Sequence, residues 1–249
     1  MTLQPDSAAM PNQRVNTTSF ELPAPGLGQV ALTTITLPEI VLRTRDGHKL
    51  RGYFGELFRE HSPLLHNHYA DGTFRQGYPL VQYKVLGGTP TLVGLGEGAA
   101  LLVELFLRIR ELDLEGRRYP VLAKHIVHEQ AAVGVDAGAL YSYRFETLWL
   151  PLNQENHREY QELGQAERQR QLSRILGNNI LAFLKRMGAD TTARVLLQLR
   201  LTEPVVTLFK NQPMLGFGGE FVSNAVLPAG VGLGKSVARG FGTVVAMSN

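Results

Sequence analysis

The sequence predicts an α+β protein built from two modules of similar layout. Several segments are rich in β-branched and aromatic residues and are bounded by turn residues, as in strands. Three longer segments place apolar residues at three- and four-residue intervals, as in amphipathic helices. Over residues 29–114 these segments follow the order strand, helix, strand, strand, helix, which is typical of a ferredoxin-like fold. The rest of the chain again predicts strands around a helix, so we expect two tandem ferredoxin-like (RRM-like) domains.

Residues 1–28 are polar and rich in Pro, Asn and Thr, without an apolar period. This composition predicts a flexible N-terminal arm. The arm lacks the basic-then-apolar order of a signal peptide. No run in the chain approaches the ~18 apolar residues that a membrane-spanning helix needs. We therefore expect a globular, cytoplasmic protein.

The first module is predicted over residues 29–116. Its expected elements are a strand in 29–44, a helix in 46–62, two strands in 78–86 and 89–98, and a helix in 97–114. Pro38 interrupts the first strand, and Asp46 is a suitable N-cap for the first helix. The turn sequence GGTP separates the next two strands.

The second module is predicted over residues 117–249. Its expected elements are strands in 119–130 and 140–152, a helix in 157–188, and strands in 193–201, 205–210, 214–227 and 242–247. Gly164 and Gly177 are expected to break or fray the long helix.

The chain contains no cysteine and seven histidines. Disulfides, thiolate metal sites and cysteine nucleophiles are therefore excluded, and only histidine and carboxylate side chains remain as strong metal ligands. No serine lies in a G-x-S-x-G motif, so the sequence does not support a hydrolase triad.

The net charge of +3 is unevenly distributed along the chain. Residues 43–84 carry a net charge of +3 and residues 185–249 a net charge of +4, whereas residues 85–184 carry −2. If the two basic segments meet on one face, they form a stripe that attracts phosphates.

The segment GLGKSVARGFG, residues 232–242, concentrates four glycines near the C-terminus. It has neither the spacing of a Walker A loop nor that of a dinucleotide-binding fingerprint. Glycines allow positive φ and close backbone approach, so successive N–H groups can bind an anion while Lys235 and Arg239 add positive charge. The alternative is a glycine hairpin that packs beside Phe241 in the core.

The run GLGKSVARGFGTV, which follows MLGFGGEF, resembles the G-x-G-x5-G-F-G loop of the RAMP superfamily of CRISPR systems, and most of all its repeat-processing endoribonucleases. The segment LRGYFGELF lies where the first helix of that family sits, and the paired α+β modules extend the resemblance over most of residues 30–249. The resemblance implies metal-independent cleavage of CRISPR repeat RNA in the precursor transcript, without a cofactor, to release guide RNAs. Binding subunits of the superfamily carry similar loops, so a non-catalytic RNA-binding subunit of a CRISPR ribonucleoprotein complex is the alternative. A third hypothesis is an interaction or scaffold protein in which the glycine loop is only a hairpin.

The resemblance also implies how RNA is held and cut. The glycine-rich loop is expected to bind the RNA backbone through Gly232, Gly234, Lys235, Arg239, Gly240 and Gly242. In the implied reaction the ribose 2′-OH attacks the adjacent phosphate, which gives a 2′,3′-cyclic phosphate and a 5′-OH. Expected partners are the precursor RNA repeat and other subunits of a CRISPR effector complex, with the chain as a monomer or a homodimer.

The proton transfers require a group that titrates near neutrality, as histidine does. His66 and His68 are the first candidates for general base or acid, because they lie in a loop after the first helix. Tyr69 stands beside them, and Lys84 on a following strand is expected to stabilise the phosphorane. The alternative is that His66 and His68 are exposed loop residues. A metal site at His66-x-His68 is not supported, since only two ligands are visible.

The remaining histidines are expected to have structural or solvent-exposed positions. His48 and His157 are expected in solvent near helix starts, and His61 at a helix end, where its interaction with the helix dipole is favourable. His125 and His128 fall on opposite faces of the strand predicted there.

Overall fold

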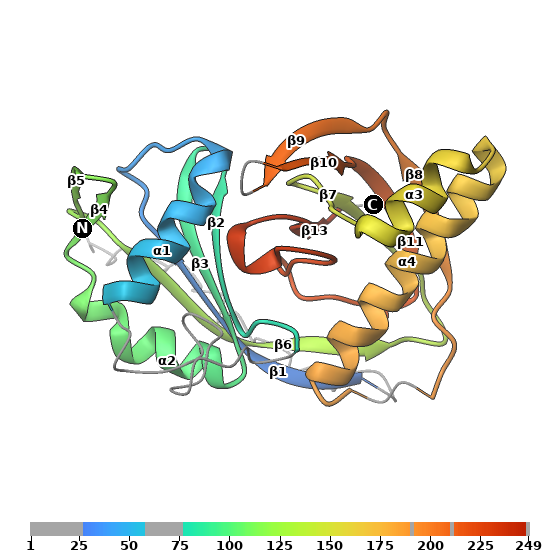
Figure 1. The fold of residues 1–249 in the computed structure, drawn as a ribbon. Coiled ribbons are helices and arrows are strands. Elements are labelled where there is room, and N and C mark those ends of the chain that lie inside the picture. Colours follow the sequence, from blue (N-terminus) through green and yellow to red (C-terminus); the bar gives the residue numbers. More distant parts are fainter. Residues whose placement is uncertain (1–26, 58–76, 190–191, 210–211, 248–249) are drawn as a thin grey trace, which may run out of the picture.

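The computed structural model describes residues 27–57, 77–189, 192–209 and 212–247. Two sheet-rich parts lie side by side, one carrying α1 and α2 and the other α3 and α4 (Figure 1). Strands β1 (Leu27–Thr36) and β6 (His125–Val135) extend beneath both parts. No helix in the described ranges is long and apolar enough to cross a membrane.

The first part is a five-stranded antiparallel sheet of order β12-β6-β1-β3-β2. Its other strands are β2 (Val81–Leu86), β3 (Thr89–Leu95) and the short β12 (Ala225–Val226). Helix α2 (Glu97–Leu105) packs on β1 and β3, and helix α1 (Gly47–Leu57) packs on β2. Leu50 and Phe54 of α1 are fully buried, and Phe54 stacks on Tyr83 of β2 with ring centroids 5.6 Å apart. The apolar spacing in α1 therefore fixes which face of the helix meets β2.

The second part is a four-stranded antiparallel sheet of order β13-β7-β11-β8. Its strands are β7 (Tyr141–Phe145), β8 (Leu197–Leu201), β11 (Gly219–Ser223) and β13 (Val244–Ala246). Helices α3 (Gln154–Glu162) and α4 (Gln165–Arg186) accompany it. An aromatic cluster fills its core, where Trp149 stacks on Phe145 with ring centroids 5.4 Å apart.

Two separate two-stranded hairpins and three 3-10 helices complete the part of the chain that the structure describes. The hairpins are β4 (Glu111–Leu114) with β5 (Arg117–Pro120) and β9 (Val205–Phe209) with β10 (Gln212–Gly216). The 3-10 turns are η1 (Thr44–Asp46), η3 (Phe106–Arg108) and η4 (Val237–Arg239). The 3-10 helix η4 contacts strand β2, and this contact joins the C-terminal segment to the first sheet.

The α+β class and the two ferredoxin-like units agree with the sequence prediction, while several element boundaries differ. The helix predicted over 97–114 ends at Leu105, because residues 111–114 pair with β5 instead. The helix predicted over 157–188 is broken at Gly164, as the sequence indicated, and Gly164 is the N-cap of α4. Gly177 lies inside α4 without a break.

The predicted boundary near residue 116 lies in the turn between β4 and β5. Strand β6 follows this turn and pairs with β1 from Leu27↔Gly134 to Thr36↔His125. Strand β12, from much later in the chain, pairs with the end of β6. Both halves of the chain therefore contribute strands to the five-stranded sheet, and the position of the domain boundary stays a prediction.

Candidate nucleic-acid interface

The glycine-rich loop of residues 232–242 packs on β2, at the junction of the two sheets (Figure 1). Gln82 of β2 is fully buried there and accepts a hydrogen bond from the Gly232 amide at 3.0 Å through its Oε1. Its Nε2 donates to the Tyr78 hydroxyl at 2.7 Å, and that hydroxyl donates to the Gly232 carbonyl at 2.8 Å. Both backbone groups of Gly232 are thus satisfied by side chains from the first half of the chain.

Lys84, two residues further along β2, is fully buried below the other end of the loop. Its Nζ donates to Thr243 Oγ1 at 2.9 Å, and the Thr243 hydroxyl lies 3.3 Å from the Gly240 carbonyl, to which it donates. Thr147 Oγ1 donates to the same carbonyl at 2.6 Å and accepts from the Thr243 amide at 2.9 Å. This network ties β2, the loop and the second sheet together.

Burial lowers the pKa of the Lys84 amine to about 7, because removal from water disfavours its charged form. No acidic side chain among the described residues forms an ion pair with it. In this arrangement Lys84 supports the loop from inside the protein. Its predicted role in stabilising a phosphorane stays a prediction.

The glycines of the loop are required by its own packing. Gly234, Gly240 and Gly242 have φ values of +88°, +90° and +63°. A Cβ on Gly242 would collide with the carbonyl oxygen of Leu233, and one on Gly240 would lie 3.1 Å from the Tyr83 carbonyl oxygen. The loop backbone is therefore held by close packing, but Phe241, which the hairpin alternative places in the core, is only partly buried and lines the pocket described next. A cradle of RNA by Gly232, Gly234, Gly240 and Gly242 stays a prediction.

A pocket of about 430 Å³ opens between the two parts of the molecule, beside the loop. Its cationic and titratable lining residues are Arg45, His48 and Arg239. The remaining lining residues include three threonines and three apolar residues, namely Thr44, Thr147, Thr207, Leu148, Leu208 and Phe241. The pocket joins η1 and α1 of the first half to the glycine-rich loop and the β9–β10 hairpin of the second half.

His48 is held at the first turn of α1. Its Nδ1 donates to the Arg45 carbonyl at 2.6 Å, so Nε2 is the ring nitrogen that this bond does not occupy. The start of α1 is itself packed on the loop, since a Cβ on Gly47 would lie 2.8 Å from the Arg239 carbonyl oxygen. The His48 side chain is exposed, as expected from the sequence, but it lines the pocket rather than open solvent alone.

Arg239 brings a guanidinium to the pocket from η4. Burial lowers the pKa of Arg239, and the nearby charge of Arg51 on α1 lowers it further. Burial likewise lowers the pKa of Arg51. Two cations held close together favour an anion beside them, because its charge relieves their repulsion. A phosphate is such an anion.

The other predicted site residues either do not line this pocket or lie outside the described residues. Lys235 is exposed, does not line this pocket, and donates its backbone N–H to the Leu150 carbonyl at 3.1 Å. His66, His68 and Tyr69 lie outside the described residues, so their catalytic roles stay predictions. Within the described part of the chain, no group of three or more His, Asp or Glu side chains could hold a metal ion.

Sequence reasoning did not select His48 or Arg45 for the site. A usable signal was the basic run RTRDGHKLR, residues 43–51, which leads into the helix that the family resemblance had already located. The pocket depends on the long-range contact of this run with the loop, a contact that local sequence patterns do not encode.

Comparison with known proteins gives consistent matches along the chain. The model of the Cas6b N-terminal domain matches residues 29–132, and that of the Cas6b C-terminal domain matches residues 136–247. An uncharacterized protein of Methanocaldococcus jannaschii is 34% identical over 142 residues, which are 57% of this chain and 96% of that protein.

Solved structures agree with these matches. A crystal structure of Cas6b is 32% identical, covers 88% of this chain and 100% of its own, and superposes with a TM-score of 0.84. A crystal structure of the CRISPR RNA processing endoribonuclease Cas6b is 29% identical with the same coverage and a TM-score of 0.72.

Replacing Lys84 by methionine removes the buried amine and keeps an apolar stem. The folded-state pKa is lowered to about 7 from 10.5, so between these values the amine is neutral when folded and protonated when unfolded. Unfolding then takes up a proton, and raising the pH stabilises the folded protein by about 1.4 kcal/mol per pH unit. The free energy of unfolding of wild type minus that of Lys84→Met, measured by urea denaturation, should rise with pH by this slope between pH 7 and 10.5. Below pH 7 the difference should stay constant. Parallel pH profiles would contradict the lowered pKa.

Replacing Gly242 by alanine should destabilise the protein, because the new Cβ meets the Leu233 carbonyl and φ is +63°. We expect a loss of about 1–3 kcal/mol in the free energy of unfolding. Gly177→Ala in α4 is the matched control, since nothing lies within 4 Å of its added Cβ. That variant should be neutral or slightly stabilised. Equal denaturation midpoints for the two variants would contradict a loop held by close packing.

Proposed function

This chain belongs to the Cas6b family, and we propose that it is an endoribonuclease that cleaves CRISPR repeat RNA in the precursor transcript to release guide RNAs. The observation that carries this proposal is the pocket at the junction of the modules, where His48, Arg45 and Arg239 meet beside the glycine-rich loop. The proposal draws further support from a similar solved protein whose name describes CRISPR RNA processing.

The proposed reaction uses the RNA's own 2′-OH as nucleophile. The 2′ oxygen forms a bond to the adjacent phosphorus as the bond from phosphorus to the 5′ oxygen breaks. The 2′ proton passes to a base and the 5′ oxygen receives a proton, so the products are a 2′,3′-cyclic phosphate and a 5′-OH. Side chains can supply both proton transfers and the charge stabilisation, so we propose a metal-independent reaction.

We assign a proton transfer to Nε2 of His48. Hydrogen bonding of Nδ1 to the Arg45 carbonyl orients the ring and directs Nε2 away from that carbonyl. The contact of Gly47 with the loop sets the distance between this ring and the RNA backbone on the loop. His66 and His68 are retained as candidates for the second proton transfer.

Charge stabilisation is assigned to Arg239, together with Arg45, which lines the same pocket. Negative charge builds on the non-bridging oxygens as the phosphorane forms, and a partly desolvated guanidinium stabilises it more strongly than one in water. Lys235, on the exposed part of the loop, binds the backbone further along the RNA.

End-labelled repeat RNA incubated with the purified chain in excess EDTA should be cut at one position. Analysis of the product ends should find a 2′,3′-cyclic phosphate. Cleavage that requires added metal would contradict the proposed mechanism. RNA that stays uncut but shifts on a native gel would instead identify a non-catalytic RNA-binding subunit.

His48→Ala should lower the single-turnover cleavage rate by about 100-fold or more and leave RNA affinity largely unchanged. His66→Ala and His68→Ala, tested alongside, identify any second proton-transfer group. His157→Ala is the control, because His157 lies on α3 and does not line the pocket. Normal cleavage by His48→Ala would remove His48 from the mechanism.

Arg239→Ala and Lys235→Ala should separate catalysis from binding. Loss of Arg239 should lower the rate at saturating RNA by about 10- to 100-fold, because it removes a cation from the reacting phosphate. Loss of Lys235 should weaken binding and reduce its salt dependence, with little change in the saturated rate. Rates measured across RNA and salt concentrations distinguish the two, and identical effects would contradict the separate roles.

A further inference from the structure

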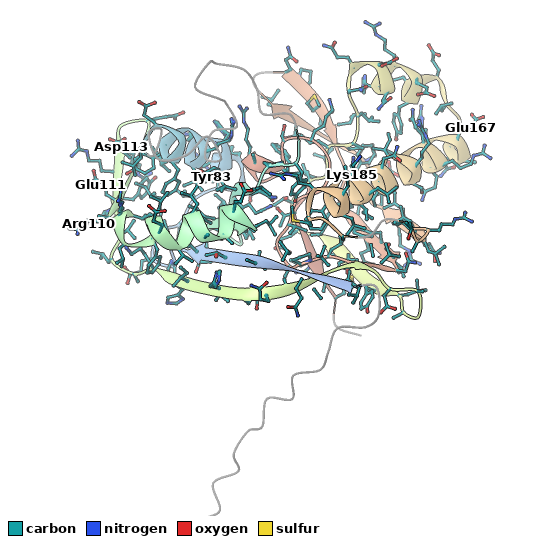
Figure 2. All side chains as sticks on the ribbon, turned by 90° about the horizontal axis from the view of Figure 1, so that it is seen from below. Tyr83, Arg110, Glu111, Asp113, Glu167 and Lys185 are labelled. Atoms are coloured by element: carbon teal, nitrogen blue, oxygen red, sulfur yellow. The ribbon has the colours of Figure 1, made fainter. Side chains whose placement is uncertain are left out.

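The hairpin of β4 and β5 is attached to helix α1 at both of its ends. At one end, the Tyr53 hydroxyl of α1 donates to the Glu111 carbonyl at 2.8 Å. At the other end, the Lys49 amine of α1 lies 2.8 Å from a carboxylate oxygen of Glu115, in the turn of the hairpin. Figure 2 shows Glu111 at the margin of the first part of the molecule, close to α1. These contacts fix the hairpin relative to the helix that carries His48.

The turn of this hairpin has a well-defined backbone. Glu115 and Gly116 have φ values of +57° and +85°, as the two central residues of a type I′ turn require. The Gly116 amide also donates to a carboxylate oxygen of Asp113 at 2.8 Å. Arg117 and Arg118 follow this turn directly, and both are exposed. Their backbone is therefore held in a defined position at the surface.

Arg117 and Tyr119 form a cation–π pair on this strand. The Arg117 guanidinium lies over the Tyr119 ring, with its central carbon 4.9 Å from the ring centroid. The Tyr119 ring is half-buried and packs against the core, whereas Arg117 is exposed. In proteins that bind single-stranded RNA, unpaired bases stack on guanidinium planes and on aromatic rings. The pair is therefore a suitable platform for one base.

The charges around this platform favour a negatively charged ligand. The neighbouring acidic side chains each have a cationic partner, since Asp113 pairs with Arg118 at 3.6 Å and Glu115 pairs with Lys49. In the described part of the chain, no acidic side chain forms an ion pair with Arg117. Arg117 thus contributes a positive charge that no carboxylate of the described chain compensates, and the phosphates of an RNA strand supply the opposite charge.

We propose that Arg117 and Tyr119 stack an unpaired base of the RNA that flanks the phosphate bound in the pocket beside the glycine-rich loop. The inference rests on the proposed function, because its ligand is the RNA that is cut in that pocket. Lys49 directly follows His48, which lines the pocket, and its ion pair with Glu115 brings the hairpin turn to the same helical turn. An RNA strand that leaves the pocket along the start of α1 therefore meets the platform on the hairpin.

Fluorescence anisotropy with labelled repeat RNA tests the protein side of this contact. Arg117→Ala should weaken binding about tenfold, because it removes both the charge and the stacking surface. Arg117→Lys should weaken binding to a similar extent, because lysine keeps the charge but has no planar face. Arg158→Ala is the matched control, since it removes an exposed arginine from α3 in the other part of the molecule, and it should bind like wild type. Wild-type affinity of Arg117→Ala, or full rescue by Arg117→Lys, would overturn the proposal.

Repeat RNAs that each lack one base test the RNA side. At one position near the cut, loss of the base should weaken binding to wild type about tenfold and leave binding to Arg117→Ala unchanged, because the stacked partner is already absent. Equal effects on both proteins at every position would contradict a stacked base.

The binding assays use RNA without the 2′-OH at the cut position, or the unmodified RNA if the chain does not cut it. Absence of cleavage therefore overturns the proposed reaction and leaves this measurement intact, whereas wild-type binding by Arg117→Ala overturns the stacking contact alone.

Discussion

The contact between strand β2 and the glycine-rich loop is the constraint on which the rest of the structure depends. Gln82 and Lys84 are two residues apart, so they point to the same side of the strand, and both are fully buried. A buried amide and a buried amine are costly unless they are hydrogen-bonded. The loop supplies partners through Gly232 and, by way of Thr243, Gly240. The hydrogen bonds that stabilise these two buried side chains are therefore the same bonds that fix the position of the loop.

The position of the proposed site follows from this contact. The loop fixes the Arg239 carbonyl against Gly47, and Gly47 begins the helix that carries His48 in its first turn. The pocket residues come from segments almost 200 positions apart in sequence, yet a short chain of backbone contacts relates them. Protein contacts that do not involve RNA therefore bring the cations of the pocket to one place. If RNA binds there as proposed, these contacts position the pocket residues beforehand and leave little rearrangement for the binding step.

Local patterns predicted much of the fold but only part of the site. Alternation and turn residues located most strands, and the glycine spacing located the loop. Residues 111–114 were assigned to a helix because ELDL continues an apolar helical period, whereas pairing with β5 across the Glu115–Gly116 turn prevailed. The sheet partner of β6 could not be read from its sequence neighbours. His48 was missed for the same reason, since its place in the proposed site comes from the tertiary contact of its helix with the loop, whereas its own segment is that of an ordinary helix start.

The two edges of the five-stranded sheet show how a fold can use the same backbone groups in different ways. On β2, a shift of the loop by one residue would leave Gln82 and Lys84 without their partners, at a cost of about 1–3 kcal/mol for each buried group. Only one register of the loop is therefore stable, and a single geometry of the pocket results. On β6, exposed side chains impose no such penalty, because water satisfies them when no partner is present. The position of the loop at the first edge thus comes from buried polar groups, whereas the exposed side chains of β6 make no comparable demand.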